Sequence, residues 1–102
     1  MPNSRVTTYD PPYQFVGTQQ VYTPTTSTAV TLPAGANGWL LQAAAQNIHI
    51  RFDGNAATTN DFVLVANDPP VKLIAPNAHY FFYCIQAASG GKLIAQPIAE
   101  QY

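Results

Sequence analysis

His49, His79 and Asp53 are the residues of this chain whose types could together hold a metal ion. Two histidines and one carboxylate bind a transition metal when the three side chains converge. Neither histidine belongs to a His-x-His pair, and nothing in the spacing brings the three residues together. Cys84 is the single cysteine, so a disulfide and a cysteine-based zinc site are both excluded. We expect a buried, inert thiol, no metal and no cofactor.

Nucleophilic catalysis would require Cys84 and His79 to act as a pair. They lie five residues apart in one apolar segment, and in a strand this offset places them on opposite faces. The carboxylates Asp53, Asp61 and Asp68 each stand where a predicted strand meets a turn, a position that favours Asp for its hydrogen bonds to the local backbone. We therefore predict that the chain is not an enzyme and has no small-molecule substrate.

Two further motifs could bind ligands. Ser89-Gly90-Gly91-Lys92 lies between two predicted strands rather than between a strand and a helix, so it predicts a hairpin turn and not a phosphate-binding loop. Trp39 or one of the tyrosines could stack on a sugar ring. We expect these rings to serve the core or a protein interface instead, because most large aromatic side chains do.

Charge is scarce along the whole sequence. Charged residues make up 9% of the 102 residues and hydrophobic residues 47%, whereas an ordinary soluble domain carries about a quarter charged residues. The net charge of −1 gives no basic surface for nucleic acid, and no apolar run approaches the ~20 residues of a membrane-spanning helix. With so little charge to keep copies apart, we expect the surface to be covered in use by other copies or by a larger assembly.

Turn-forming residues divide positions 19–102 into short strands. The clearest alternation lies near the middle, where Ile48 and Ile50 face one way and His49 and Arg51 face the other. The expected strands are Gln19–Thr23, Thr28–Leu32, Gly38–Ala44, Asn47–Asp53, Asp61–Ala66, Val71–Ala75, His79–Ala87 and Lys92–Ile98. About eight short strands without a helix predict an all-β fold, a small antiparallel β-sandwich that is jelly-roll-like.

Residues 1–18 differ from the rest in composition. They contain the pair Pro11-Pro12, which favours an extended backbone, and the aromatic residues Tyr9, Tyr13 and Phe15. A disordered tail is one interpretation. We favour an extended arm that lies on a neighbouring subunit, because a solvated tail rarely carries three aromatic residues in so short a span. The chain then consists of an arm, 1–18, and a sandwich domain, 19–102.

The expected strand His79–Ala87 is rich in aromatic residues on both faces. Phe81 and Tyr83 alternate with Tyr80 and Phe82. One face fills the core of a sandwich, so the other exposes two aromatic side chains unless a partner covers it. We predict that Tyr80 and Phe82 join Tyr9, Tyr13 and Phe15 in a protein interface.

Residues 26–98 resemble small virion proteins of tailed bacteriophages and prophages. The resemblance lies in strand and turn motifs: Val30-Thr31-Leu32-Pro33-Ala34-Gly35, Gly38-Trp39-Leu40-Leu41-Gln42-Ala43, Ile50-Arg51-Phe52-Asp53-Gly54, Asp68-Pro69-Pro70 and Ile85-Gln86-Ala87-Ala88-Ser89-Gly90-Gly91-Lys92-Leu93. In those proteins a similar Arg-aromatic-Asp-Gly hairpin precedes a Thr/Ala loop. The resemblance implies a structural component of the virion and carries over no catalytic residue.

The sequence thus predicts a capsid decoration or cement protein that bridges neighbouring capsid subunits. Its expected partners are the major capsid protein and copies of itself, as a homotrimer, and its expected location is the capsid surface after synthesis in the host cytoplasm. A head–tail connector or tail-associated adaptor is the first alternative. A carbohydrate-binding module for host attachment is the second.

Overall fold

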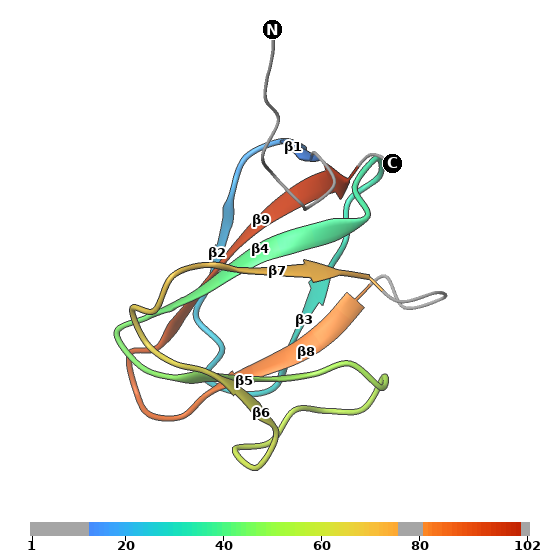
Figure 1. Ribbon diagram of the computed structural model, residues 1–102. Helices are drawn as coiled ribbons and strands as arrows, with labels where there is room; N and C mark the ends of the chain where they lie inside the picture. Colours follow the sequence, from blue (N-terminus) through green and yellow to red (C-terminus); the bar gives the residue numbers. More distant parts are fainter. Residues whose placement is uncertain (1–12, 76–80, 101–102) are drawn as a thin grey trace, which may run out of the picture.

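The computed structural model describes residues 13–75 and 81–100. These residues form nine β-strands and no helix (Figure 1). The strands are β1 (Tyr13–Phe15), β2 (Gln20–Tyr22), β3 (Thr28–Thr31), β4 (Gly38–Ala44), β5 (Ile48–Arg51), β6 (Phe62–Leu64), β7 (Val71–Ile74), β8 (Phe81–Gln86) and β9 (Lys92–Glu100). Each of the eight segments expected from the sequence coincides with one of the strands β2 to β9, although β9 continues past the expected end at Ile98 to Glu100. β1 lies within the expected arm.

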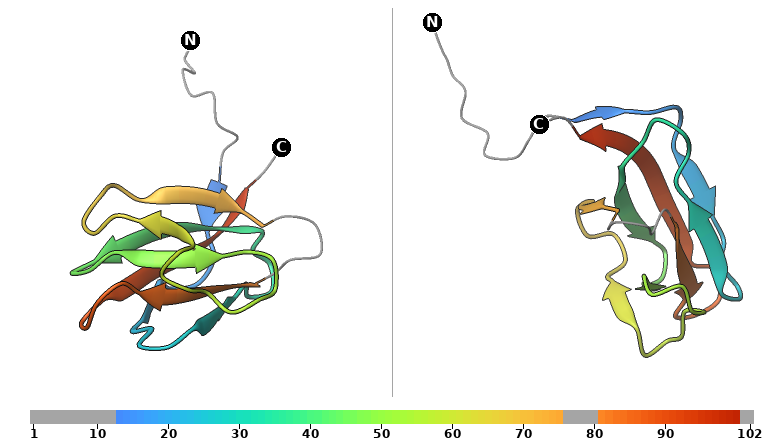
Figure 2. Two further views of the ribbon diagram at one scale, coloured as in Figure 1. Left: turned by 90° about the horizontal axis from the view of Figure 1, so that it is seen from below. Right: turned by 90° about the vertical axis from the view of Figure 1, so that its right-hand side faces the viewer.

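The strands form two antiparallel sheets that pack face to face (Figure 2). One sheet has the order β1-β9-β4-β7, with β2 pairing to β9 along the same edge as β1. The other has the order β3-β8-β5-β6. We call them the five-stranded and the four-stranded sheet. Without a helix to cover either one, each sheet buries its inner face against the other, and the predicted all-β sandwich is confirmed.

The strand pairs are nested along the chain. β5 pairs with β6, β4 with β7, β3 with β8 and β2 with β9, all antiparallel. This is the pattern of one long hairpin. The additional pairs β4–β9 and β5–β8 close the folded hairpin into two sheets, and this arrangement is the connectivity of a jelly roll.

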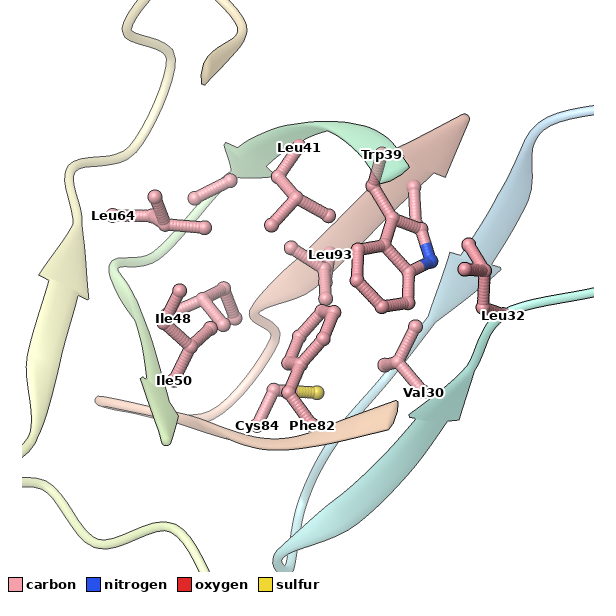
Figure 3. Packing of buried hydrophobic residues seen from close by; sticks show 12 residues of the cluster. Val30, Leu32, Trp39, Leu41, Ile48, Ile50, Leu64, Phe82, Cys84 and Leu93 are labelled. Carbon is pink, nitrogen blue, oxygen red and sulfur yellow. The ribbon is translucent and has the colours of Figure 1, made fainter. Parts of the chain in front are cut away.

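The core is centred on three aromatic rings from both sheets. Trp39 of β4 lies 5.0 Å from Phe82 of β8, ring centre to ring centre and edge to face, and Phe52 lies 4.8 Å from Phe82. Figure 3 shows Trp39 and Phe82 pointing toward one another between the sheets, with Cys84 beside them. Burial raises the pKa of the Cys84 thiol to about 12, so it stays protonated and unreactive at neutral pH. The expectation of a buried thiol is confirmed.

The prediction that Phe82 belongs to an interface was wrong. Phe82 is 0% exposed, whereas Phe81 and Tyr83 on the other face of β8 are partly exposed. The reason is register, because Phe82 pairs with the fully buried Val30 on β3. The alternation of the sequence showed two aromatic faces on this strand but did not show which one turned inward.

The turn between β8 and β9 depends on glycine. Gly90 has a φ of 90°, a backbone conformation that residues with a side chain rarely adopt. The amide of Gly91 donates a hydrogen bond to the Gln86 side chain at 3.1 Å. This segment is the hairpin turn expected from its sequence.

Candidate interaction surface

Exposed large hydrophobic side chains gather in two places on the described residues. The first group, which we call the β1 patch, comprises Tyr13, Phe15 and Val21, which are 42%, 62% and 54% exposed. The second group, the β6–β7 patch, comprises Phe62, Val63, Val65 and Val71. A small protein rarely leaves such groups uncovered unless they contact something.

The β1 patch is held in place by pairing with β9. Tyr13 lies opposite Glu100 and Phe15 opposite Ile98, and the amide of Val16 donates to the carbonyl of Pro97 at 2.9 Å. Residues 13–15 are therefore a strand of the five-stranded sheet. The boundary at residue 18 does not separate an arm from the sandwich, and residues 1–12 lie outside the described part of the chain.

An ion pair supports Tyr13 on this face. The Lys72 ammonium lies 2.7 Å from a Glu100 carboxylate oxygen and 5.8 Å from the centre of the Tyr13 ring. The Glu100 side chain is only 5% exposed, and the Asn37 side chain accepts a hydrogen bond from the Glu100 amide at 2.8 Å. These contacts connect β1, β7 and β9, so the exposed Tyr13 ring is held against the sheet by its neighbouring strands.

A hollow lies beside Phe15 on the outer face of the five-stranded sheet. It has a volume of about 170 Å³. Its lining residues are Phe15, Gln19, Leu40, Gln42, Pro70, Ile94 and Gln96, and none of them is charged. A face of this kind offers apolar contact with a few amide groups, which is typical of the centre of a protein interface.

The outer face of the four-stranded sheet carries charges that pair with one another. The Arg51 guanidinium donates to Asp53 at 2.8 Å and lies 3.8 Å from Asp61. The hydrogen bond from Arg51 holds the pKa of Asp53 well below its usual range, and that of Arg51 is raised by the same contact. These residues are engaged with each other and form no empty binding site.

The same residues shape the long loop between β5 and β6. The Asp53 carboxylate accepts a hydrogen bond from the amide of Asn55 at 3.0 Å, and the Asp61 carboxylate accepts one from the amide of Thr58 at 2.7 Å. The amide of Ala57 donates to the Ser27 hydroxyl at 2.9 Å, which fastens the loop near the start of β3. The interpretation of Asp53 and Asp61 as turn residues is confirmed.

The structure brings together only part of the predicted interface. Tyr13 and Phe15 form one exposed pair, their rings stacked with centres 6.5 Å apart. Phe82 is in the core, and Tyr9 and Tyr80 lie outside the described residues.

Trp39 is also buried, with no exposed surface, and cannot stack on a sugar. The carbohydrate-binding alternative therefore cannot rely on Trp39, and the expectation that this ring belongs to the core is confirmed. His79, one of the two histidines considered as metal ligands, lies outside the described residues. His49 is placed on β5, where its Nδ1 lies 2.9 Å from the Asp61 carbonyl oxygen.

Leu40 and Ile94 were not predicted from the sequence as residues of an interaction surface. Each lies between two buried neighbours on its strand, Leu40 between Trp39 and Leu41 and Ile94 between Leu93 and Ala95. Strict alternation therefore placed both on the outer face. What the sequence could not show is that these two outer positions border the same hollow as Phe15.

Comparison with known proteins adds no relative: the chain matches no family model, no curated protein and no solved structure. Within residues 13–75 and 81–100, no three His, Cys, Asp or Glu side chains are grouped as a metal site would require. The same residues contain no helix that could span a membrane. The function must therefore be argued from the surface itself.

Proposed function

We propose that this protein is a structural component of a tailed-phage virion, a decoration protein that binds the outside of the capsid and bridges neighbouring subunits. The observation that carries the proposal is on the outer face of the five-stranded sheet, where the exposed rings of Tyr13 and Phe15 lie beside a hollow with no charged residue in its lining. The resemblance of residues 26–98 to small phage virion proteins supports the same assignment. The proposal involves no catalysis and no cofactor.

Burial of apolar surface supplies the binding energy in this proposal. Covering an apolar face contributes about 25 cal/mol per Å² of buried area before the costs of association are subtracted. A single weak contact is strengthened when many copies bind an ordered shell through several subunits each. Such a protein needs a stable fold and an apolar face rather than an active site, and a homotrimer would suit positions where three capsid subunits meet.

The test is binding of the purified protein to a panel of undecorated tailed-phage capsids. Co-sedimentation should recover the wild-type protein with at least one capsid. Ile94→Glu places a charge in the hollow and should reduce binding at least tenfold. The matched control is Thr31→Glu, because Thr31 is exposed on the opposite, four-stranded sheet, and it should bind like the wild type.

Electron microscopy of gold-labelled protein on whole virions locates the contact. Label over the whole shell supports decoration. Label confined to one vertex or to the tail would replace decoration with the connector or adaptor alternative. Failure to bind any capsid, connector or tail would refute the proposed function.

A further inference from the structure

Asn37 lies directly before β4, and hydrogen bonds engage both its backbone and its side chain. The side-chain nitrogen donates to the Glu100 carbonyl oxygen at 3.2 Å, and the side-chain oxygen accepts from the Glu100 amide at 2.8 Å. The backbone amide donates to the Ile98 carbonyl and the backbone carbonyl accepts from the Ala75 amide, both at 2.9 Å. The side chain thus pairs with Glu100 as a peptide group would, and it fastens the end of β9.

Gly38 follows Asn37, and the packing of β4 requires a glycine there. A Cβ atom at position 38 would lie 2.7 Å from the Leu73 carbonyl oxygen and 2.8 Å from the Ile74 side chain. The first of these atoms belongs to the backbone of β7, so a larger residue would displace that strand. Of the seven asparagines in the sequence, only Asn37 precedes a glycine. The fold therefore requires the glycine of this Asn-Gly pair and uses its asparagine to hold β9.

An Asn-Gly pair can react with itself, and asparagine is for this reason a thermolabile residue. The glycine nitrogen attacks Cγ of the asparagine, which is easiest when the following residue has no Cβ to crowd the approach. The new bond joins this nitrogen to Cγ, the bond from Cγ to Nδ2 breaks, and the proton of the glycine amide leaves with Nδ2 as ammonia. Water then opens the cyclic succinimide at either of its carbonyl groups. The products are aspartate and isoaspartate.

The folded structure opposes this ring closure. Gly38 lies within β4, opposite Ile98 of β9 and Ile74 of β7, so its backbone is held from both sides. The Asn37 side chain is held toward Glu100 by its two hydrogen bonds. Ring closure requires that side chain to leave Glu100 and turn back on Gly38. The reaction therefore needs the end of β9 to separate from Asn37.

We propose that Asn37 is a deamidation site, protected while its side chain holds Glu100 and reactive when the end of β9 separates from it. The products cannot restore the contact. An ionised aspartate has no hydrogen-bond donor, so the Glu100 carbonyl would face a carboxylate oxygen in place of an N–H group. Glu100 lies opposite Tyr13 and pairs with Lys72, so deamidation loosens the edge of the sheet that carries β1.

The first test uses the free wild-type protein. Folded and urea-unfolded samples are kept at the same mildly alkaline pH, and peptide mapping by mass spectrometry gives the rate at each asparagine. In urea Asn37 should react fastest of all. In the folded protein it should react at least about tenfold more slowly than in urea, because a fastened strand end opens only transiently. Equal rates in the two samples, or no reaction at Asn37 in urea, would overturn the proposal.

Lys72→Met tests whether the end of β9 controls the reaction. The substitution removes an ionic partner of Glu100 and leaves Asn37 and Gly38 in place. The folded variant should deamidate at Asn37 about tenfold faster than the wild type. Lys92→Met is the matched control, at an exposed position near the other end of β9, and should keep the wild-type rate. If both variants reacted at one rate, the reaction would not depend on the end of β9 and the proposal would be wrong.

Asn37→Asp tests the consequence by supplying one product directly. Hydrogen exchange should show faster exchange of the β1 amides than in the wild type. Asn60→Asp makes the same change in the exposed loop between β5 and β6 and should leave them unaffected. Unchanged β1 amides in Asn37→Asp would contradict the loosening of this edge. If that variant does not fold, wild-type protein deamidated at Asn37 and separated by ion exchange replaces it. None of these measurements involves a capsid, so failure to bind one would refute the proposed function alone.

Discussion

β1 and β8 both carry aromatic side chains, but β8 buries one of its rings completely whereas β1 exposes both of its rings. On β1, Tyr13 and Phe15 are 42% and 62% exposed, whereas on β8 Phe82 is fully buried. β1 pairs with one strand at the edge of its sheet, and β8 lies between β3 and β5. The same residue type thus stabilises the fold at the centre of a sheet and is available to a partner at its edge.

The two sheets also differ in how they use the few charged residues, which make up 9% of the chain. On the four-stranded sheet the outward charges pair among themselves, as Arg51 and Asp53 do. On the five-stranded sheet Lys72 pairs with Glu100 beneath Tyr13, and the hollow next to it is uncharged. The charged side chains thus hold loops and strands in place, and the uncharged hollow remains available for contact with a partner.

The largest difference between the two strands should appear on truncating Phe82. Phe82→Ala removes a ring packed against Trp39 and Phe52, so we expect the free energy of unfolding to fall by about 3–5 kcal/mol. Urea denaturation measures it. A loss below about 1 kcal/mol would show that the centre of the sandwich is not packed as described.

A smaller effect is expected where β1 is fastened to the sheet. Lys72→Met removes the charged partner of Glu100 while keeping a long apolar side chain, and should cost about 1–3 kcal/mol. The amides of β1 should exchange with solvent faster than in the wild type. Lys92→Met is the control, because Lys92 is exposed, and should change stability by less than about 0.5 kcal/mol. Equal effects of the two substitutions would show that the Lys72–Glu100 ion pair does not stabilise β1.

Truncation of the exposed ring should have little effect on the monomer. Phe15→Ala should lower the free energy of unfolding by less than about 1 kcal/mol, because the side chain is already largely in solvent. Binding to capsids, followed by co-sedimentation, should nevertheless weaken clearly. A loss as large as that of Phe82→Ala would mean that Phe15 is part of the core and not of a contact surface.

The smallest effect is expected at Cys84, which should not react with a thiol reagent while the protein is folded. Cys84 is fully buried on the inner face of β8, and its raised pKa leaves no thiolate to react near pH 8. A thiol reagent should label the native protein negligibly and the urea-unfolded protein completely. Rapid labelling of the native form, read by mass spectrometry, would show that β8 is not held at the centre of its sheet.

The fold could be predicted from the sequence because its signals are local. Alternation placed Ile48 and Ile50 inside and His49 and Arg51 outside, and turn residues located all eight expected strands. β1 was missed because its three residues, Tyr13–Phe15, are too few to establish a pattern of alternation and directly follow two prolines. Its pairing with β9 is decided more than eighty residues away.

The surface was harder to predict because it depends on which strands are neighbours. The face of β8 that turns inward follows from pairing Phe82 with Val30, and the sequence of either strand alone does not reveal it. The hollow beside Phe15 combines residues of β1, β4 and β9 with the segment before β7. The hollow lined by Ile50, Phe52, Phe62 and Leu73 brings together residues from both sheets.

The nested order of the strand pairs has a consequence for how the chain acquires its fold. The hairpin β5–β6 joins residues close in sequence and can form early, whereas β2–β9 joins residues more than seventy positions apart. Contacts of such long range slow folding, because a large loop must close before they are made. β9 lies between β2 and β4 in its sheet. A nascent chain that lacks β9 therefore cannot complete the five-stranded sheet. Until β9 has been synthesised, the apolar strands of that sheet remain at risk of aggregation.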